Sequence, residues 1–283
     1  MQSRPVPLDR LREQVRDKPA LPALSRQRYA LTHAQYEAAS DQRPRLQEWL
    51  VRELPPLLAE RDPVRIVGVG VGDGSIDAPL AAALAADGRR VHYTGVEPDT
   101  ASAMGFASRL NALGAAALIP TVVIGNFDDH DAGHPADLVH FVHSLYYVAD
   151  LSAALDHGLS MVRPGGLLLA ATAPLRPLCV LTELLCPWGG RQPWFADDVR
   201  AELDFRGLTV HAVTLVGHLD LRVALTEPLG RGEAVLDFLV GARTAALGRA
   251  ARAQLIDYLR DISLPGQPGV VPHPLDITIA RVP

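Results

Sequence analysis

The chain has 283 residues, a length typical of one large domain or of one domain with an added cap. With 48% hydrophobic and 21% charged residues it can bury a sizeable core, which excludes the fibrous, collagen-like and disordered classes. Its formal charge of -5, from 27 Lys and Arg against 32 Asp and Glu, creates no field that would attract nucleic acid or an anionic membrane, so we expect neither as a partner.

No charged segment followed by an apolar run opens the sequence, and glycines and a proline interrupt its longest uncharged stretch, residues 111–127. We therefore expect a cytoplasmic protein that does not span a membrane. The two cysteines, Cys179 and Cys186, lie in an apolar stretch and are expected to be reduced and structural. Because no second pair of Cys or His stands at a suitable spacing, we predict no metal site.

The first 28 residues mix prolines with charges and lack a sustained apolar period, which predicts an N-terminal arm ahead of one domain over residues 29–283. Between Arg43 and Glu60, apolar residues recur at three- and four-residue spacing. This period predicts an amphipathic helix that packs on the core that follows.

Short apolar runs then alternate with helical patterns over residues 62–172. The predicted strands are residues 64–70, 91–97, 120–125, 136–143 and 166–173, and the predicted helices are residues 75–88, 99–114 and 152–161. Such alternation indicates the α/β class, with a parallel sheet and helices on both of its faces.

After about residue 173 the pattern loosens into a Pro- and Trp-rich stretch. A helix at 196–205, a strand at 208–216, two helical stretches and a last strand at 275–281 follow. We expect residues 173–283 to complete the sheet and to supply a cap on the substrate side.

A glycine-rich turn follows the first predicted strand, with glycines at positions 70, 72 and 74 and a helix expected near Ser75. Bare backbone amides at the start of a helix favour the approach of a polar ligand. The dinucleotide pattern G-x-G-x-x-G would require Gly or Ala where Ser75 stands. The spacing therefore favours the amino-acid part of S-adenosylmethionine over NAD.

Glu97 ends the second predicted strand, where an acidic side chain can accept two hydrogen bonds from a ribose diol. Because the same acid would serve an NAD enzyme, Glu97 indicates a nucleoside site in general, and the glycine spacing selects the nucleoside. The structural alternative is a turn that only packs a helix on a strand, with Glu97 as a surface acid.

Residues 136–172 combine a strand, a polar and aromatic linker, a helix opened by Asp150, and an Arg-Pro-Gly-Gly turn into the next strand. This segment resembles class I methyltransferases, which implies a Rossmann-like α/β fold with a seven-stranded sheet. In that class the end of the fourth strand and the linker face the transferable methyl group. Asn126 and Phe127 match the positions that hold the adenine by hydrogen bond and stacking.

Within that class, the segments RIVGVGVGDGSID, GVEP and HSLYYVAD resemble the histamine N-methyltransferase family. The resemblance implies S-adenosylmethionine as cofactor. The candidate cofactor-binding residues are Gly70, Gly72, Gly74, Glu97, Pro98, Ser102, Asn126, Phe127 and Val142. Ser102 departs from the amide side chain of that family.

The substrate side departs further from that family. Its acidic position falls at Asp41 or Gln42, and its two amides are replaced by His143 and His273. We therefore expect a small-molecule acceptor other than histamine. The candidate substrate-binding residues are Asp41, Gln42, Tyr146, Tyr147, Trp194 and His273.

His143 is the candidate catalytic residue, because an imidazole titrates near neutrality and could take a proton from the acceptor. A histidine that is satisfied structurally is the alternative for this position. His140 is expected to face away from the cofactor edge, because side chains alternate along a strand.

These features predict methyl transfer from S-adenosylmethionine to a nitrogen or oxygen of a small molecule, in specialised (natural product) metabolism. Three alternatives stay open: an enzyme that uses the bound cofactor for a non-methylating reaction, a non-catalytic binding protein of the same fold, and an NAD oxidoreductase. The glycine spacing disfavours the last of these.

Overall fold

The computed structural model describes residues 7–131 and 133–283, so the first six residues of the predicted arm lie outside the described residues. The chain divides into two compact units. The sheet unit comprises residues 43–173, 194–215 and 275–283, and the helical unit comprises the segments up to residue 42, 174–193 and 216–274.

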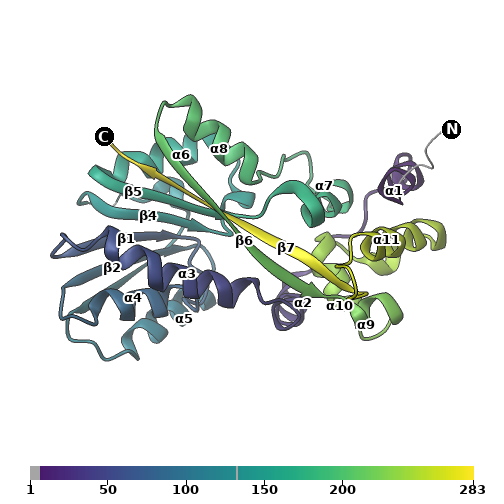
Figure 1. The fold of residues 1–283 in the computed structure, drawn as a ribbon, viewed down its shortest axis with the longest axis horizontal. Helices are drawn as coiled ribbons and strands as arrows, with labels where there is room; N and C mark the ends of the chain where they lie inside the picture. The colour runs from purple at the N-terminus through teal and green to yellow at the C-terminus, as the bar shows by residue number, and fades with distance from the viewer. Residues whose placement is uncertain (1–6, 132) are drawn as a thin grey trace. The chain divides into compact units, whose positions relative to one another are not determined.

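A seven-stranded sheet has the order β3-β2-β1-β4-β5-β7-β6 (Figure 1). Its strands are β1 (Val64–Val69), β2 (Val91–Glu97), β3 (Leu118–Ile124), β4 (Ala136–Val142), β5 (Val162–Thr172), β6 (Thr209–Asp220) and β7 (Val270–Arg281). Neighbours among the first five strands are parallel, whereas β7 is antiparallel to β5. The predicted Rossmann-like seven-stranded α/β sheet is therefore confirmed, as a mixed sheet.

Helices cover both faces of the sheet unit (Figure 1). One face packs against α3 (Gln42–Leu57), α4 (Asp77–Ala85) and α5 (Thr100–Asn111), and the other against α6 (Leu151–Met161) and α8 (Ala196–Phe205). Side chains alternate accordingly along β1, where Ile66 joins the first core and Val67 the second. Burial on both faces explains why these strands read as nearly continuous apolar runs.

The register brings the ends of three strands to one edge. Val69, the last residue of β1, pairs with Val96 of β2 on one side and with Phe141 of β4 on the other. Because parallel strands end at the same edge, the residues that follow, including Glu97 and Val142, flank the turn that leaves β1.

The helical unit contains α1 (Pro7–Val15), α2 (Arg26–Ala38), α7 (Val180–Leu185), α9 (Arg222–Thr226), α10 (Glu233–Val240) and α11 (Arg249–Asp261). Short helical segments of the chain are η1 (Phe127–Asp129), η2 (Leu145–Tyr147), η3 (Leu175–Cys179) and η4 (Thr244–Ala246). No helix among the described residues has the length and apolar character needed to cross a membrane.

The described part of the predicted arm differs from the expectation. Residues 7–15 form α1, which packs on α11 and buries Leu8 and Leu11. Two leucines three residues apart form an apolar stripe that is too short to be recognised as helical periodicity in the sequence alone.

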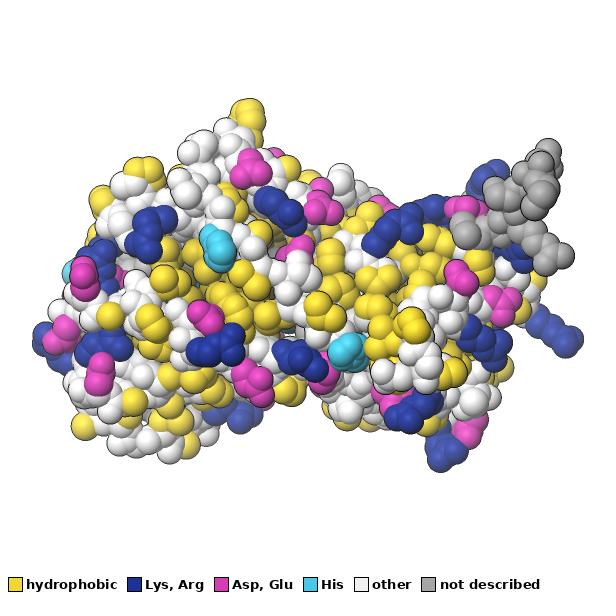
Figure 2. Space-filling model, viewed as in Figure 1, with side chains coloured by type: hydrophobic (Ala, Val, Ile, Leu, Met, Phe, Trp, Pro, Cys, Tyr) yellow, Lys and Arg dark blue, Asp and Glu magenta, His cyan; other side chains and the backbone are white. Residues whose placement is uncertain are grey.

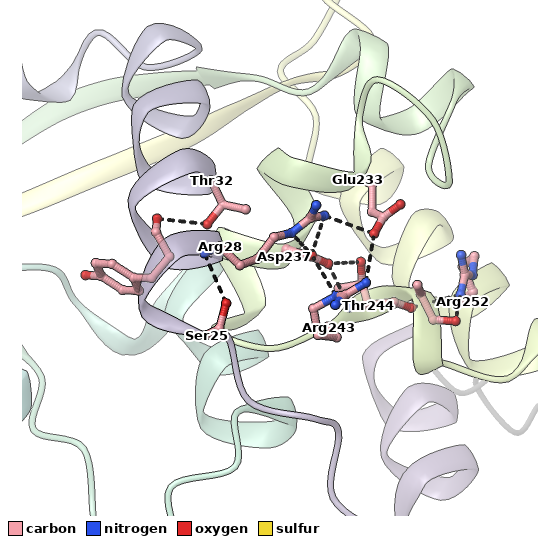
Figure 3. A network of polar contacts seen from close by, with 10 residues as sticks. Ser25, Arg28, Thr32, Glu233, Asp237, Arg243, Thr244 and Arg252 are labelled. Atoms are coloured by element: carbon pink, nitrogen blue, oxygen red, sulfur yellow. Dashed lines mark hydrogen bonds and ion pairs between the residues drawn. The ribbon is translucent and has the colours of Figure 1, made fainter.

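A buried carboxylate joins α2 to α10 within the helical unit (Figure 3). The side chain of Asp237 is fully buried, and its Oδ2 accepts hydrogen bonds from Arg28 at 2.7 and 3.0 Å. Its Oδ1 accepts from the backbone N–H and the hydroxyl of Thr244, at 2.8 and 2.6 Å. Arg28 also donates to Glu233 at 2.9 Å. Such a buried charge is tolerated only when it is paired and hydrogen-bonded.

Replacement Arg28→Met should lower the free energy of unfolding by about 3–5 kcal/mol, because it leaves Asp237 charged, buried and without its main partner. Urea denaturation measures this loss. The control is Arg231→Met, which removes an exposed ion pair with Glu227 and should leave the stability close to that of the wild type. Equal stability of the two variants would contradict the role given to Arg28.

Candidate active site

The glycine turn connects β1 to α4. Gly70, Gly72 and Gly74 have φ angles of 68, 56 and 73°, which other residues rarely adopt. A Cβ on Gly70 would lie 2.6 Å from Cβ of Ser144, and one on Gly74 would lie 2.9 Å from the ring of Phe106. A Cβ on Gly72 would meet no described atom within 4 Å. The middle glycine therefore borders open space, where a ligand can approach the backbone.

Glu97 is 8% exposed and contacts this turn. Its Oε2 accepts a hydrogen bond from the Gly72 N–H at 2.9 Å, and its Oε1 accepts from the Asp99 N–H at 2.9 Å. Burial raises the pKa of the Glu97 carboxyl, and the hydrogen bond from Gly72 opposes that rise. A carboxylate has about four lone-pair positions, so the two oxygens keep capacity for the hydroxyls of a ribose.

Two helices hold the turn in place. From α3, Arg43 donates to the hydroxyl of Ser75 at 2.9 Å and Gln47 donates to the carbonyl of Ser75 at 2.8 Å. From α5, Arg109 donates to the carboxylate of Asp73 at 2.7 Å and to its carbonyl at 3.1 Å. These bonds fix the turn before a ligand arrives, which lowers the entropy cost of binding.

A buried polar cluster that sequence reasoning missed adjoins the turn. Tyr93 donates to Oδ1 of Asp77 at 2.8 Å, and its hydroxyl lies 2.8 Å from Nε2 of His140. His140 reaches Tyr93 across β1 at Gly68, where a Cβ would lie 2.8 Å from the imidazole. The cluster thus links β2, β4 and the first residue of α4. The glycine at position 68 is its only sequence signal.

Three further candidate cofactor residues are Ser102, Pro98 and Val142. The hydroxyl of Ser102 donates to Oδ2 of Asp99 at 2.9 Å, and its N–H donates to the same oxygen at 3.0 Å. Ser102 therefore takes part in the cap that starts α5. Pro98 is exposed, and Val142 is half-buried at the end of β4, where it pairs with Ala171.

Phe127 packs in a cluster of aromatic rings. Its side chain is 8% exposed, and its ring packs at 89° against Phe141, with ring centroids 5.3 Å apart. It also contacts the ring of His157 at 4.7 Å. The Phe127 ring thus lies among other aromatic rings, and its stacking on an adenine stays a prediction. Asn126, the preceding residue, is exposed.

His143 begins the linker after β4 with a φ of 53°, the one positive value at a non-glycine among the described residues. Its N–H donates to the carbonyl of Ala171 at 3.0 Å. Its Nδ1 lies 3.1 Å from the hydroxyl of Tyr146, which accepts a hydrogen bond from the Ala173 N–H at 2.6 Å. A strained backbone of this kind is a marker of functional sites.

The other aromatic candidates surround this linker. The indole N–H of Trp194 donates to the carbonyl of Val148 at 3.2 Å, and Phe195 packs against Tyr146 with ring centroids 6.4 Å apart. Tyr147 is 54% exposed. In the sheet unit, the candidates Tyr146 and Tyr147 thus lie on η2, and Trp194 lies on the segment that leads into α8.

His273 lies in the helical unit and is 8% exposed. Its Nε2 lies 2.9 Å from the hydroxyl of Tyr36, and its Nδ1 lies 2.8 Å from the hydroxyl of Ser40. Burial lowers the pKa of His273 to about 4, against the influence of Glu37 and Asp41. Both ring nitrogens are thus engaged by hydroxyl groups inside the unit.

Asp41 and Gln42 adjoin this histidine. The Gln42 amide donates to the carbonyls of His273 and Pro274, at 3.0 Å each. Asp41 accepts from the backbone N–H of His218 at 2.6 Å and lies 3.2 Å from its Nδ1. The structure therefore brings the three predicted substrate residues of this unit together, through bonds within the fold. No three metal-binding side chains gather among the described residues.

Comparison with known proteins agrees with this geometry. A model of the methyltransferase domain family matches residues 37–210, which is more than half of the chain. The chain therefore belongs to the methyltransferase domain family. Its cofactor is S-adenosylmethionine, as the glycine spacing predicted. A search of curated proteins finds no match, so the likeness to histamine N-methyltransferase rests on the three sequence segments alone.

Solved structures give the same fold. The YcgJ protein of Bacillus subtilis is 12% identical, with a TM-score of 0.56 over 83% of this chain and 98% of that chain. The N-methyltransferase NodS of Bradyrhizobium japonicum, in complex with S-adenosylhomocysteine, is 14% identical, with a TM-score of 0.48 over 86% of this chain and 90% of that chain. The first likeness shows the fold, and neither assigns an acceptor.

Replacement Gly68→Ala should destabilise the protein by about 1–3 kcal/mol, because the new Cβ would lie 2.6 Å from Val71 and 2.8 Å from the ring of His140. Urea denaturation measures the loss. Gly248→Ala is the matched control, since a Cβ there meets no described atom within 4 Å. A Gly68→Ala protein as stable as this control would show that His140 does not need the space at Gly68.

The free energy of unfolding should fall by about 3 kcal/mol as the pH drops from about 6.5 to about 4. In the unfolded chain His273 takes up a proton at its ordinary pKa of 6.5, whereas in the folded protein its pKa is lowered to about 4. Above pH 6.5 this contribution is constant. Denaturation series at several pH values measure the slope, and His273→Gln should remove that part of it. An unchanged slope in the variant would contradict the prediction.

Proposed function

We propose that the sheet unit binds S-adenosylmethionine at the edge where β1, β2 and β4 end, and transfers its methyl group to a nitrogen or oxygen of a small molecule. The observation that carries this proposal is the Glu97 carboxylate bonded to Gly72, beside the open space at that glycine. Bare backbone suits the amino-acid part of the cofactor, and the acid suits its ribose.

When bound beside Gly72 and Glu97, S-adenosylmethionine would supply an electrophilic methyl group on a positively charged sulfur, and the acceptor would release a proton on transfer. The chain contributes orientation and the exclusion of water. Holding the acceptor in line at about 3 Å accounts for most of the rate enhancement in such a reaction. The aromatic side chains Tyr146, Tyr147 and Trp194 are proposed to wall the acceptor site.

A small acceptor agrees with the surface charge. On the face shown in Figure 2, Lys and Arg side chains alternate with Asp and Glu side chains, without a broad region of one sign. A nucleic-acid substrate would call for a basic region that tracks its backbone. We further propose a role in specialised metabolism, and an acceptor other than histamine because His143 and His273 replace the amides of that family.

Calorimetric titration with S-adenosylmethionine, S-adenosylhomocysteine and NAD tests the proposal, which expects binding of the first two only. Glu97→Gln should weaken S-adenosylhomocysteine binding by about 1.5–3 kcal/mol, because a charged acceptor of hydrogen bonds is lost. Affinity should also fall as the pH drops, starting above the ordinary pKa of a glutamate, because burial raises the pKa of Glu97. The variant should lack this pH dependence.

The control is Glu53→Gln, an exposed acid on α3 that should leave the affinity unchanged. Binding of NAD alone would overturn the proposal. If S-adenosylmethionine binds, a panel of amines and phenols is screened by mass spectrometry for the gain of one methyl group. A converted compound without that gain would indicate the non-methylating enzyme, and cofactor binding without any turnover would indicate the non-catalytic binding protein.

A further inference from the structure

Helix α6 lies close against the sheet at Gly158. A Cβ on this glycine would lie 3.1 Å from the ring of Phe141 on β4 and 3.1 Å from Cδ1 of Leu168 on β5. The lack of a side chain at Gly158 therefore lets α6 approach the two strands. His157, the preceding residue, is thereby brought to the segment that follows β3, where it contacts Phe127 and His130.

The imidazole of His157 holds this segment through its backbone. Nε2 lies 3.2 Å from the carbonyl oxygen of Phe127 and 2.9 Å from that of His130. Because a carbonyl oxygen can only accept, Nε2 carries the proton and donates it to both oxygens. The ring also packs on that of Phe127, with centroids 4.7 Å apart. One side chain of α6 thus fixes both ends of the short helix η1.

The start of the segment is joined to Glu97, which carries the proposed ribose site. Glu97 pairs with Ile124, the last residue of β3, and the Gly125 N–H donates to the carbonyl of Glu97 at 3.2 Å. Residues 125–130, the β3 loop, therefore run from Glu97 on β2 to His157 on α6.

The order of the strands gives the β3 loop its place beside the proposed cofactor site. In the sheet, β2 lies between β1 and β3, and neighbouring strands are about 4.8 Å apart. The proposed function puts the amino-acid part of S-adenosylmethionine at the turn after β1 and its ribose at the end of β2. Continuing in the same direction along this edge, the base attached to the ribose meets the β3 loop, where Asn126, Asp128 and Asp129 are exposed.

The structure assigns His157 as a positioning residue for cofactor binding: by donating to the carbonyls of Phe127 and His130, it holds the β3 loop where the loop binds the 6-amino edge of the adenine. This inference rests on the proposed function. His157 acts through the loop and does not touch the cofactor. Backbone N–H and C=O groups have a fixed polarity, so a loop held in one position distinguishes a 6-amino purine from a 6-oxo purine, in which donor and acceptor are exchanged.

Calorimetric titration with S-adenosylhomocysteine and S-inosylhomocysteine tests the inference, because the two probes differ only at that edge of the base. The wild type should bind S-adenosylhomocysteine at least about tenfold more tightly than S-inosylhomocysteine. His157→Leu leaves the two carbonyls without their donor, so it should reduce this ratio to about threefold or less, mainly through weaker binding of S-adenosylhomocysteine. His157→Gln offers two amide N–H donors to the same carbonyls and should keep the ratio within about threefold of the wild type.

The control is His211→Leu, which changes an exposed histidine on β6 and should leave both affinities unchanged. Hydrogen exchange followed by mass spectrometry gives a readout without ligand. Residues 125–130 should exchange faster in His157→Leu than in the wild type, and His157→Gln should restore the slow exchange. Urea denaturation of each variant detects a general loss of structure, which would weaken the binding of both probes by the same factor.

An unchanged ratio in His157→Leu, or equal losses in His157→Leu and His157→Gln, would overturn the inference alone. A wild type that binds both probes equally would also overturn it, because the base then does not meet a fixed β3 loop. Failure of the proposed function is distinguishable from these outcomes, since the wild type would then bind neither probe, and the inference would fall with it.

Discussion

The hydrogen bond from the Gly72 N–H to the Glu97 carboxylate is the interaction on which the site depends. It ties the turn after β1 to the end of β2, and it requires a glycine conformation on one side and a buried acid on the other. The parallel register makes the bond possible, because it ends both strands at one edge. Helices α3 and α5 then hold the turn in place through hydrogen bonds to Ser75 and Asp73.

Most of the fold could be predicted from the sequence, because hydrophobic periodicity and glycine placement are local signals. The five parallel strands, the helix before them and the pairing of the glycine turn with an acid all follow from such patterns. Contacts between distant segments leave no local trace. Burial of Phe127 against Phe141 is of that kind, as is the reach of His140 across Gly68. Alternation along a strand predicts which face of the sheet His140 is on, but it does not predict that its partner is Tyr93.

The candidate histidines His143 and His273 have different surroundings. His273 is enclosed by hydroxyl groups on both ring nitrogens, and its burial keeps it neutral over the physiological range of pH. His143 lies on a strained turn with one nitrogen bonded to a tyrosine. Sequence patterns could not reveal the surroundings of His273, because Tyr36 and Ser40 lie 237 and 233 positions away in the chain.

The pairing of the first helices with the last ones has a consequence for the growing polypeptide. Arg28 and Asp237 are 209 positions apart, and β5 gains its antiparallel neighbour only when residues up to Arg281 exist. At synthesis rates of roughly 5–20 residues per second, Asp237 is synthesised about 10 to 40 s after its partner Arg28 on α2. During that interval α1 and α2 lack the later helices α11 and α10 on which they pack. A chain truncated before β7 would also expose the edge of β5 to other strands.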